Sequence, residues 1–251
     1  MAKNTGIIQI QRKLGNVVFD KRGSVCVAGG STAAKFNSSG SMQRTRENAS
    51  EFTKAATTGK VFRLAMRQLV AAAGDSLITS RVTKKMRELI ALDDINIRGQ
   101  RGILDAETEA LVGFEINANS SFSQTVFVAP AVTIDRGTGE VLVTFTGIKP
   151  LQDVAAPSDT THIKFIMTAS AINFEEEIFD SKTTETDFLP YNNTAVLAAA
   201  STLSVDLGDN STNPIVCGIG VEFFQQVNGQ QYALNNGAYN SAVIAKVDAT
   251  I

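Results

Sequence analysis

Short apolar runs separated by turn residues make up the first part of the chain. Residues 6–11, 16–19 and 24–27 are runs rich in Ile, Val and Phe, and the turn-forming segments 14–16 and 21–23 separate them. This pattern predicts a ribbon of two or three β-strands. Such a ribbon is marginally stable alone, so we expect it to pack on the rest of the chain or on another subunit. Residues 1–28 are called the N-terminal arm below, and residues 29–41 have the composition of a flexible linker.

From residue 42 the apolar positions repeat with the period of an α-helix. One stripe recurs every three or four residues and ends at Gly74, and a second begins after Asp75 or Ser76, either of which can cap a helix. The two stripes predict a helical hairpin that stops at Asp93. The expected buried positions are Phe52, Ala55, Gly59, Phe62, Met66, Leu69 and Ala73 on the first helix and Ile78, Val82, Met86, Leu89 and Ile90 on the second.

After residue 101 the pattern is that of β-strands. Strand-like runs cover 111–118, 125–129, 140–146, 162–169, 172–179, 202–207, 215–226 and 239–247, with turn signals at 135–139, 228–229 and 236–237. Their number and spacing predict an antiparallel β-sandwich of the immunoglobulin or fibronectin type III kind. The expected fold is α+β and mainly β, with an N-terminal β-arm and linker (1–41), a basic helical hairpin (42–97) and a C-terminal sandwich (98–251).

Charge is divided between the two ends of the chain. Residues 1–101 hold 18 Lys/Arg and 7 Asp/Glu, a net of +11, whereas residues 102–251 hold 5 and 18, a net of −13. Opposite charge at the two ends favours head-to-tail contact between copies, which closes into rings or continues as filaments. The alternative is that the basic helices pack on the acidic sandwich within one subunit.

Several segments resemble a family of uncharacterised bacterial proteins, a domain of unknown function. Gly15-Asn16-Val17-Val18-Phe19 is similar to the GNLTFY-like hairpin of that family, and residues 43–52 are similar to its FQRTREN-x-SEF helix start. The other matching segments are Gly29-Gly30, Arg-Gly-Gln-Arg at 98–101, 161–165 and 239–243. The chain departs from the pattern at Met42, where a Phe is usual, and in its less aromatic hairpin. The resemblance implies a C-terminal sandwich and supplies no catalytic residues.

The candidates for chemistry each have a simpler structural interpretation. Residues 57–61 are similar to the end of a phosphate-binding loop, but the required upstream glycine position holds Lys54 and the segment is helical. His162 has no acid nearby in the sequence, which favours a solvent-facing histidine. Residues 175–177 are three consecutive Glu, which we interpret as a charged strand edge with Glu175 and Glu177 on one side.

The remaining polar candidates and the cysteines also lack a recognisable site. Asp206, Asp209 and Asn210 do not match a calcium-loop spacing, and a turn is favoured. One His and two Cys are too few for a His/Cys metal site or a disulfide framework, so Cys26 and Cys217 are expected to be small buried apolar residues. We therefore expect no enzyme activity, no cofactor and no metal.

The favoured function is that of a structural subunit that assembles with itself into a filament, tube or phage-like particle. The expected interface comprises Ile7, Ile8, Ile10, Val17, Val18 and Phe19 of the arm, Lys60, Arg63, Arg67, Lys84 and Lys85 of the helices, and Glu175 and Glu177. The partner is another copy of the chain, and no membrane, nucleic acid or small molecule is expected. Two alternatives stay open: a binding module whose sandwich loops hold a protein or glycan, and a DNA-binding protein that uses the helical hairpin. No stretch of the sequence has the pattern of a secretion signal, so we expect synthesis in the cytoplasm.

Overall fold

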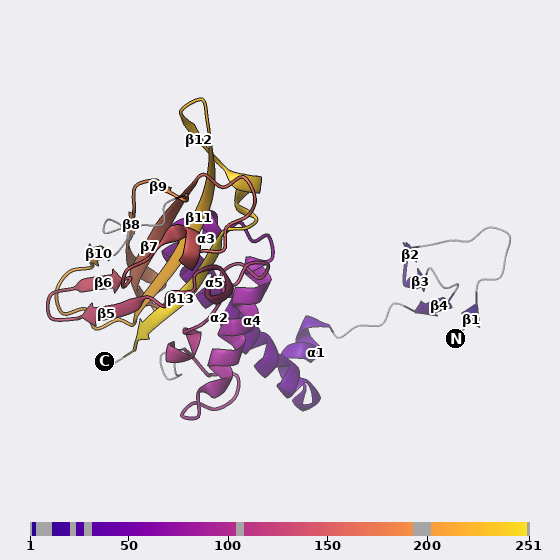
Figure 1. Cartoon of the computed structure of the whole chain (residues 1–251). Helices are drawn as coiled ribbons and strands as arrows, with labels where there is room; N and C mark the ends of the chain where they lie inside the picture. The colour runs from indigo at the N-terminus through magenta and orange to yellow at the C-terminus, as the bar shows by residue number, and fades with distance from the viewer. Residues whose placement is uncertain are drawn as a thin grey trace. The chain divides into compact units, whose positions relative to one another are not determined.

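The structure is a computed structural model that describes residues 2–3, 12–20, 24–27, 32–103, 108–192 and 202–249. Its contacts divide the chain into two compact units, residues 1–49 and residues 50–251 (Figure 1). The first contains the arm, and the second, called the body below, contains most of the helical residues and both large sheets. The expected three-part division at 41/42 and 97/98 stays a prediction.

The arm forms a small antiparallel sheet with the strand order β1-β4-β3-β2. Its strands are β1 Ala2–Lys3, β2 Arg12–Leu14, β3 Val17–Phe19 and β4 Ser24–Val27. The predicted turn between β2 and β3 is confirmed, because Gly15 has a φ of 57°, a value that favours glycine. The flexible linker expected over 29–41 stays a prediction. In its described part, Thr32 accepts a hydrogen bond from the backbone N–H of Lys35 and caps α1 (Ala33–Ser38), and η1 (Gly40–Met42) follows.

The predicted helical hairpin is present as three helices: α2 (Gln43–Ala65), α3 (Arg67–Ala73) and α4 (Ile78–Leu92). The first predicted helix is interrupted at Met66, whose φ and ψ of −96° and 22° are not helical, and it ends at Gly74 in the left-handed conformation. All the residues of the two predicted stripes are buried except Phe52, which is 55% exposed. The helical period therefore identified the face of the hairpin that packs.

The larger sheet of the body has six antiparallel strands built around the long neighbours β7 (His162–Asn173) and β11 (Ile215–Val227). β7 also pairs with β8 (Ile178–Glu185) and β9 (Leu189–Pro190), and β11 pairs with β12 (Gln230–Ala233) and β13 (Ser241–Asp248). The turn Asn228-Gly229 between β11 and β12 has positive φ at both residues, as a tight hairpin of this handedness requires. This hairpin extends beyond the rest of the body in Figure 1.

A second, three-stranded sheet has the order β10-β6-β5 and packs on one face of the six-stranded sheet. Its strands are β5 (Ala131–Asp135), β6 (Glu140–Thr144) and β10 (Thr202–Asp206). The predicted turn at 135–139 joins β5 to β6. The shared core contains Val141, Val143 and Phe145 from one sheet and the odd-numbered residues of β7 and β11 from the other, such as Phe165 and Phe223. The period of two in these strands thus reflects a buried inner face.

The helices cover the opposite face of the six-stranded sheet within the same chain. Phe62, Met66 and Leu69 join Val216 and Ile244 of the sheet in one buried cluster. A Cβ added to Gly218 of β11 would lie 2.5 Å from Leu69 Cδ2 and 2.8 Å from Met66 Cε, so any side chain there would force these two helix side chains to move. Packing of the basic hairpin on the acidic part of the chain, one of the two alternatives above, is therefore observed, and apolar residues make it.

The chain contains helices and antiparallel sheets in similar amounts, with a curled C-terminal sheet, so the expectation of a mainly β fold is too strong. Several predicted strands are wrong. The predicted run 111–118 begins in η2 (Thr108–Leu111) and holds one isolated bridge, at Glu115. The run 125–129 begins in α5 (Phe122–Thr125) and holds one isolated bridge, at Val126, and 172–179 divide between β7, a turn and β8. The predicted hairpin turn at 236–237 lies in η4 (Leu234–Gly237), and α6 (Pro150–Asp153) completes the elements.

Candidate assembly surfaces

The arm has one apolar face that is largely open. The strand register places Leu14, Val17 and Val27 on this face, with Phe19 and Val25 beside them. Leu14 and Val27 are 70% and 74% exposed. Val17 and Phe19 are half-buried, and so is Val18, but Val18 pairs with Lys13 and Cys26 on the other face. The predicted Ile7, Ile8 and Ile10 lie outside the described residues.

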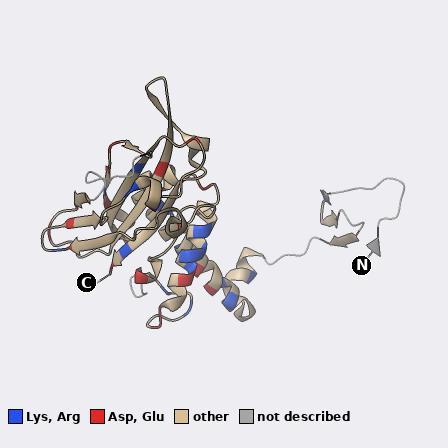
Figure 2. Cartoon of the chain, in the orientation of Figure 1, with Lys and Arg blue, Asp and Glu red and all other residues tan. Residues whose placement is uncertain are grey.

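The predicted basic residues are spread over three helices. Lys60 and Arg63 lie on α2, Arg67 on α3, and Lys84 and Lys85 on α4, and Figure 2 shows Lys and Arg on these helices. Lys60, Arg67 and Lys84 are exposed, whereas Arg63 and Lys85 are half-buried. The Lys84 Nζ lies 3.9 Å from Glu88 Oε1, so this charge has an acidic neighbour on its own helix.

The predicted acidic pair lies in a turn and not on a strand. Residues 174–177 connect β7 to β8, and Glu177 has a positive φ of 58°. Asn173 Oδ1 accepts hydrogen bonds from the backbone N–H groups of Glu175 (3.1 Å) and Glu176 (2.9 Å), which fixes the turn. The interpretation of Glu175 and Glu177 as an alternating strand edge is therefore wrong, because the chain reverses there.

Both glutamates line a cavity of about 470 Å³ in the body. Its walls come from α2, the end of α4, the loop after α4 and the β7–β8 turn. The lining residues are Thr53, Lys54, Thr57, Thr58, Ile90, Asn96, Gln100, Gly102, Ile103, Phe174, Glu175 and Glu177. Of these residues, only Glu175 and Glu177 were predicted from the sequence to belong to an interface. The α2 and β7–β8 walls are more than a hundred residues apart, and no local pattern connects them.

The loop that forms one wall of this cavity is held by the buried carboxylate of Asp93. It accepts hydrogen bonds from the backbone N–H groups of Ile95 (3.0 Å), Asn96 (2.9 Å) and Gly102 (2.8 Å), and from the Asn96 side chain (3.1 Å). Burial alone would raise the pKa of Asp93, but these hydrogen bonds outweigh it and lower the pKa to about 2. The carboxylate therefore acts as a structural anion, which the sequence showed only as a helix end.

Lys54 supports the same wall from α2. Its Nζ donates to the carbonyl oxygens of Gln100 (2.6 Å) and Arg101 (2.8 Å), and Ser50 Oγ donates to the carbonyl of Gly99 (2.8 Å). Glu51 Oε1 accepts from the backbone N–H of Gly99 at 2.8 Å. The wall is therefore fixed before anything enters the cavity.

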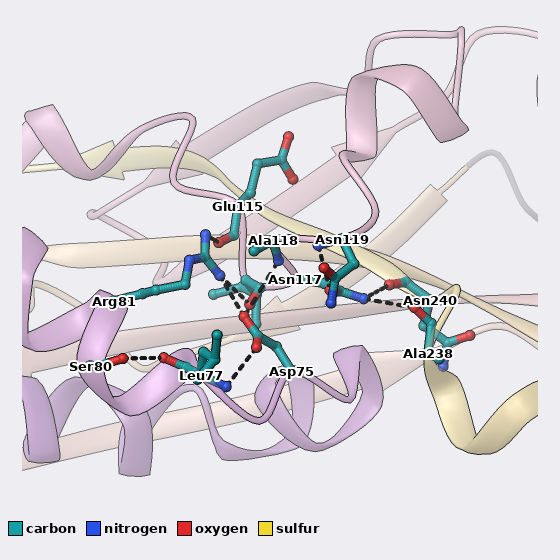
Figure 3. A network of polar contacts seen from close by, with 11 residues as sticks. Asp75, Leu77, Ser80, Arg81, Glu115, Asn117, Ala118, Asn119, Ala238 and Asn240 are labelled. Atoms are coloured by element: carbon teal, nitrogen blue, oxygen red, sulfur yellow. Dashed lines mark hydrogen bonds and ion pairs between the residues drawn. The ribbon is translucent and has the colours of Figure 1, made fainter.

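A second polar network joins the α3–α4 turn to the sheet (Figure 3). Arg81 donates to Asp75 Oδ2 (2.7 Å) and to the carbonyl oxygens of Glu115 (2.6 Å) and Ile116 (3.0 Å). Burial raises the pKa of Asp75, yet hydrogen bonds from the Leu77 N–H and from Arg81 produce a net lowering. The Asp75 carboxylate and both terminal nitrogens of the Arg81 guanidinium have partners within the chain, so we interpret the network as structural.

Asn117 and Asn240 extend this network across the sheet. Asn117 Nδ2 donates to the carbonyl of Asn240 at 2.7 Å, and Asn240 Nδ2 donates to the carbonyl of Ala72 at 2.7 Å (Figure 3 shows the first contact). These amides connect the helical hairpin to the strand region before β13. They are 123 residues apart, so no local sequence pattern indicates the contact.

The other chemical candidates occupy ordinary structural positions. His162 is half-buried, with its Nδ1 3.0 Å from Thr161 Oγ1, and Asp206 Oδ1 accepts from the Gly208 N–H in a turn (2.7 Å). Burial raises the pKa of Cys217 to about 12, whereas Cys26 is exposed, so the expectation that both cysteines are buried is wrong for Cys26. Within the described ranges, no group of three or more His, Cys, Asp or Glu side chains is placed to hold a metal ion.

Comparisons with protein-family models, curated proteins and solved structures find no match for this chain. Among its described helices, none has the length and apolar character needed to cross a membrane.

Proposed function

We propose that the chain is a non-enzymatic structural subunit that assembles with copies of itself into a filament, tube or phage-like particle. The observation that carries the proposal is the open apolar face of the arm, defined by Leu14, Val17, Phe19, Val25 and Val27. Exposed apolar faces of this kind in a small sheet are typical of contact surfaces. A neighbouring subunit can bury this face and stabilise the marginal sheet at the same time.

The body supports the proposal because it has complete hydrophobic cores of its own. One face of the six-stranded sheet packs on helices and the other on the three-stranded sheet, and both buried clusters comprise residues from Ala55 onward. Among the described residues, none from the arm belongs to either cluster. An arm outside these cores is available for assembly.

The division of charge between the two units also supports contact between copies. The unit 1–49 holds 8 Lys/Arg and 2 Asp/Glu, a net of +6, whereas the unit 50–251 holds 15 and 23, a net of −8. Attraction between the unlike units of two copies favours a head-to-tail arrangement, which propagates when the rotation between copies does not close. The resemblance to a bacterial family and the immunoglobulin-like form of the packed sheets are further proposals that this function does not require.

Removal of residues 1–28 tests the function. We expect the full chain to form ordered polymers in negative-stain microscopy, and the truncated chain to be a monomer in size-exclusion chromatography with light scattering. The truncated body should still unfold cooperatively, since its clusters are unchanged. A truncated chain that polymerises like the parent, or one that loses its cooperative transition, would contradict the proposal.

DNA binding is the second candidate, because Lys60, Arg67 and Lys84 are exposed and lie on the helices. Phosphate contacts through such residues weaken steeply as salt rises. Under the assembly proposal, the parent and a variant with Arg63, Arg67, Lys84 and Lys85 changed to Gln both fail to bind duplex DNA. Salt-sensitive binding by the parent that disappears in the variant would make DNA binding the better candidate.

A further inference from the structure

We propose that the β2–β3 hairpin tip of one copy inserts into the cavity between the loop after α4 and the β7–β8 turn of a second copy. This inference rests on the proposed function and identifies the surface that receives the arm. The acceptor surface is defined as the cavity lined by Ile103, Glu175 and Glu177, among others, together with its exposed apolar rim.

Exposed isoleucines, which we call the rim, neighbour the lining residues in the sequence. Ile95 and Ile97 flank the lining residue Asn96 and are 74% and 70% exposed, and Ile178 follows the lining residue Glu177 and is 55% exposed. Apolar side chains this exposed, next to a cavity with Ile90, Ile103 and Phe174 in its lining, favour an apolar occupant. The hairpin tip presents such a residue in Leu14.

The opposite wall supplies negative charge. Glu175 and Glu177 are exposed, and within the part of the chain that the structure describes neither carboxylate has a hydrogen bond or an ion pair. Lys54, the nearby cation in the lining, donates instead to two backbone carbonyls of the loop. The wall therefore attracts a cation from outside the chain.

The hairpin tip matches both walls. Leu14 and Lys13 are adjacent and exposed, and their side chains project to opposite faces of the strand. A tip that enters edge-on places Leu14 against the Ile97 wall and Lys13 toward Glu175 and Glu177. The arm as a whole carries 5 Lys/Arg and 1 Asp, a net of +4, which strengthens this attraction.

Another exposed apolar patch on the body fits the arm less well. It contains Phe188, which is 42% exposed and stacks edge-on with Phe224. Lys164 Nζ lies 5.4 Å from the Phe188 ring and forms an ion pair with Glu185, so the carboxylate beside this patch is already neutralised within the chain. The positive charge of the arm therefore favours the cavity, with its two glutamates, over the Phe188 patch.

Crosslinking between separately purified full-length variants tests the position of the tip. One variant carries Leu14→Cys and the other Ile97→Cys, both with Cys26→Ser so that the exposed native thiol does not react, and Cys217 is left in place because it is buried. After mixing, a short bismaleimide should produce chains of doubled mass. The matched control replaces Ile97→Cys with Phe188→Cys, which should yield roughly tenfold less product if electrostatic complementarity selects the cavity.

A charge exchange gives a second readout that does not depend on new cysteines. Lys13→Glu alone, and Glu175→Lys with Glu177→Lys, should each raise the concentration needed for half-assembly by roughly tenfold, and combining them should restore most of the loss. A chain that carries both Leu14→Cys and Ile97→Cys and crosslinks only within itself, with no product between the separate variants, would overturn the proposal. Arm-dependent assembly without the crosslink and without rescue would overturn the acceptor surface while leaving the proposed function intact, whereas no assembly by the parent would overturn both.

Discussion

Similar apolar residues are buried in the body and exposed in the arm. In the body, the central sheet is covered on both faces, and residues such as Phe62, Phe165 and Phe223 are at most 1% exposed. In the arm, no described strand is longer than four residues, and Leu14 and Val27 stay in contact with solvent. The difference arises from size, because strands this short offer too little apolar surface to hold a second layer of the chain over them.

This comparison separates residues that stabilise the fold from residues available for contact. A buried side chain contributes stability in proportion to the apolar area removed from water, whereas an exposed apolar side chain contributes only when a partner covers it. Substitutions in the body should therefore change the unfolding transition, and substitutions in the arm should change association.

The largest effect is expected for Phe62→Ala on α2. Phe62 is fully buried between the helices and the sheet, so its removal leaves a cavity and should lower the free energy of unfolding by about 3–5 kcal/mol, measured by urea titration. Phe52→Ala, on the same helix but at an exposed position, is the matched control and should change it by less than about 1 kcal/mol. Phe19→Ala in the arm should leave this transition unchanged and reduce assembly; a loss of body stability would break the comparison.

Asp93→Asn should have the next largest effect. The amide presents N–H groups where the carboxylate accepts hydrogen bonds from Gly102 and Asn96, so buried donors lose partners at a cost of about 2–3 kcal/mol. Asp94→Asn is the matched control, because Asp94 is adjacent and exposed. Equal effects of the two substitutions on the urea midpoint would show that the loop does not depend on the buried carboxylate.

The pH dependence of stability tests the role of the Asp93 carboxylate a second way. Because the folded-state pKa of Asp93 is lowered from 3.8 to about 2, its ionised form stabilises the body above about pH 4. This contribution is lost as the pH falls toward 2. We expect the stability difference between the parent and Asp93→Asn to shrink over that range in thermal melts, and a constant difference would contradict the assignment.

Arg81→Gln should cost about 2 kcal/mol, since it removes an ion pair with the buried Asp75 and donors to two backbone carbonyls. The exposed Arg87 lies on the same helix, and Arg87→Gln should be nearly neutral. Circular dichroism melts of both variants provide the measurement. An Arg81 variant as stable as the Arg87 variant would mean that the network in Figure 3 does not hold the helical hairpin on the sheet.

Salt should have the smallest effect on the body and a clear one on assembly. Raising the ionic strength from about 0.05 M to 1 M shortens the screening length from roughly 14 Å to 3 Å, so contacts between unlike units of two copies weaken. We expect light scattering to show slower or reversed assembly while the urea midpoint of the truncated body moves little. Assembly that is indifferent to salt would mean that apolar or strand contacts dominate the interface.

Periodicity predicted much of the architecture. The helical stripes identified the buried face of α2–α4, and the runs at 162–169, 202–207, 215–226 and 239–247 lie within or largely on observed strands. Predictions failed where tertiary contacts decided the local conformation. Residues 111–118 lie along β13 as an irregular segment with a single bridge, Glu115 to Val243, although their pattern is that of a strand.

The candidate surfaces were only partly accessible to sequence reasoning. The basic helices, the apolar arm and the two glutamates were identifiable from composition and local pattern. The cavity was not, because it joins α2, the Asp93 loop and the β7–β8 turn, whose residues are up to 124 positions apart between Thr53 and Glu177. The turn at Glu175 was missed because consecutive glutamates fit a charged strand edge as well as a reversal of the chain.

The sequence alone determined which faces of the helices and long strands are apolar, because burial repeats with the period of each backbone conformation. It also determined the division of charge between the ends of the chain. The tertiary structure decided that the helices cover the sheet at Gly218, that Asp93 is a buried anion, and that the arm keeps an open apolar face. These features depend on which distant surfaces meet, and pairing between distant segments is set by the packing of the whole chain and not by any local pattern.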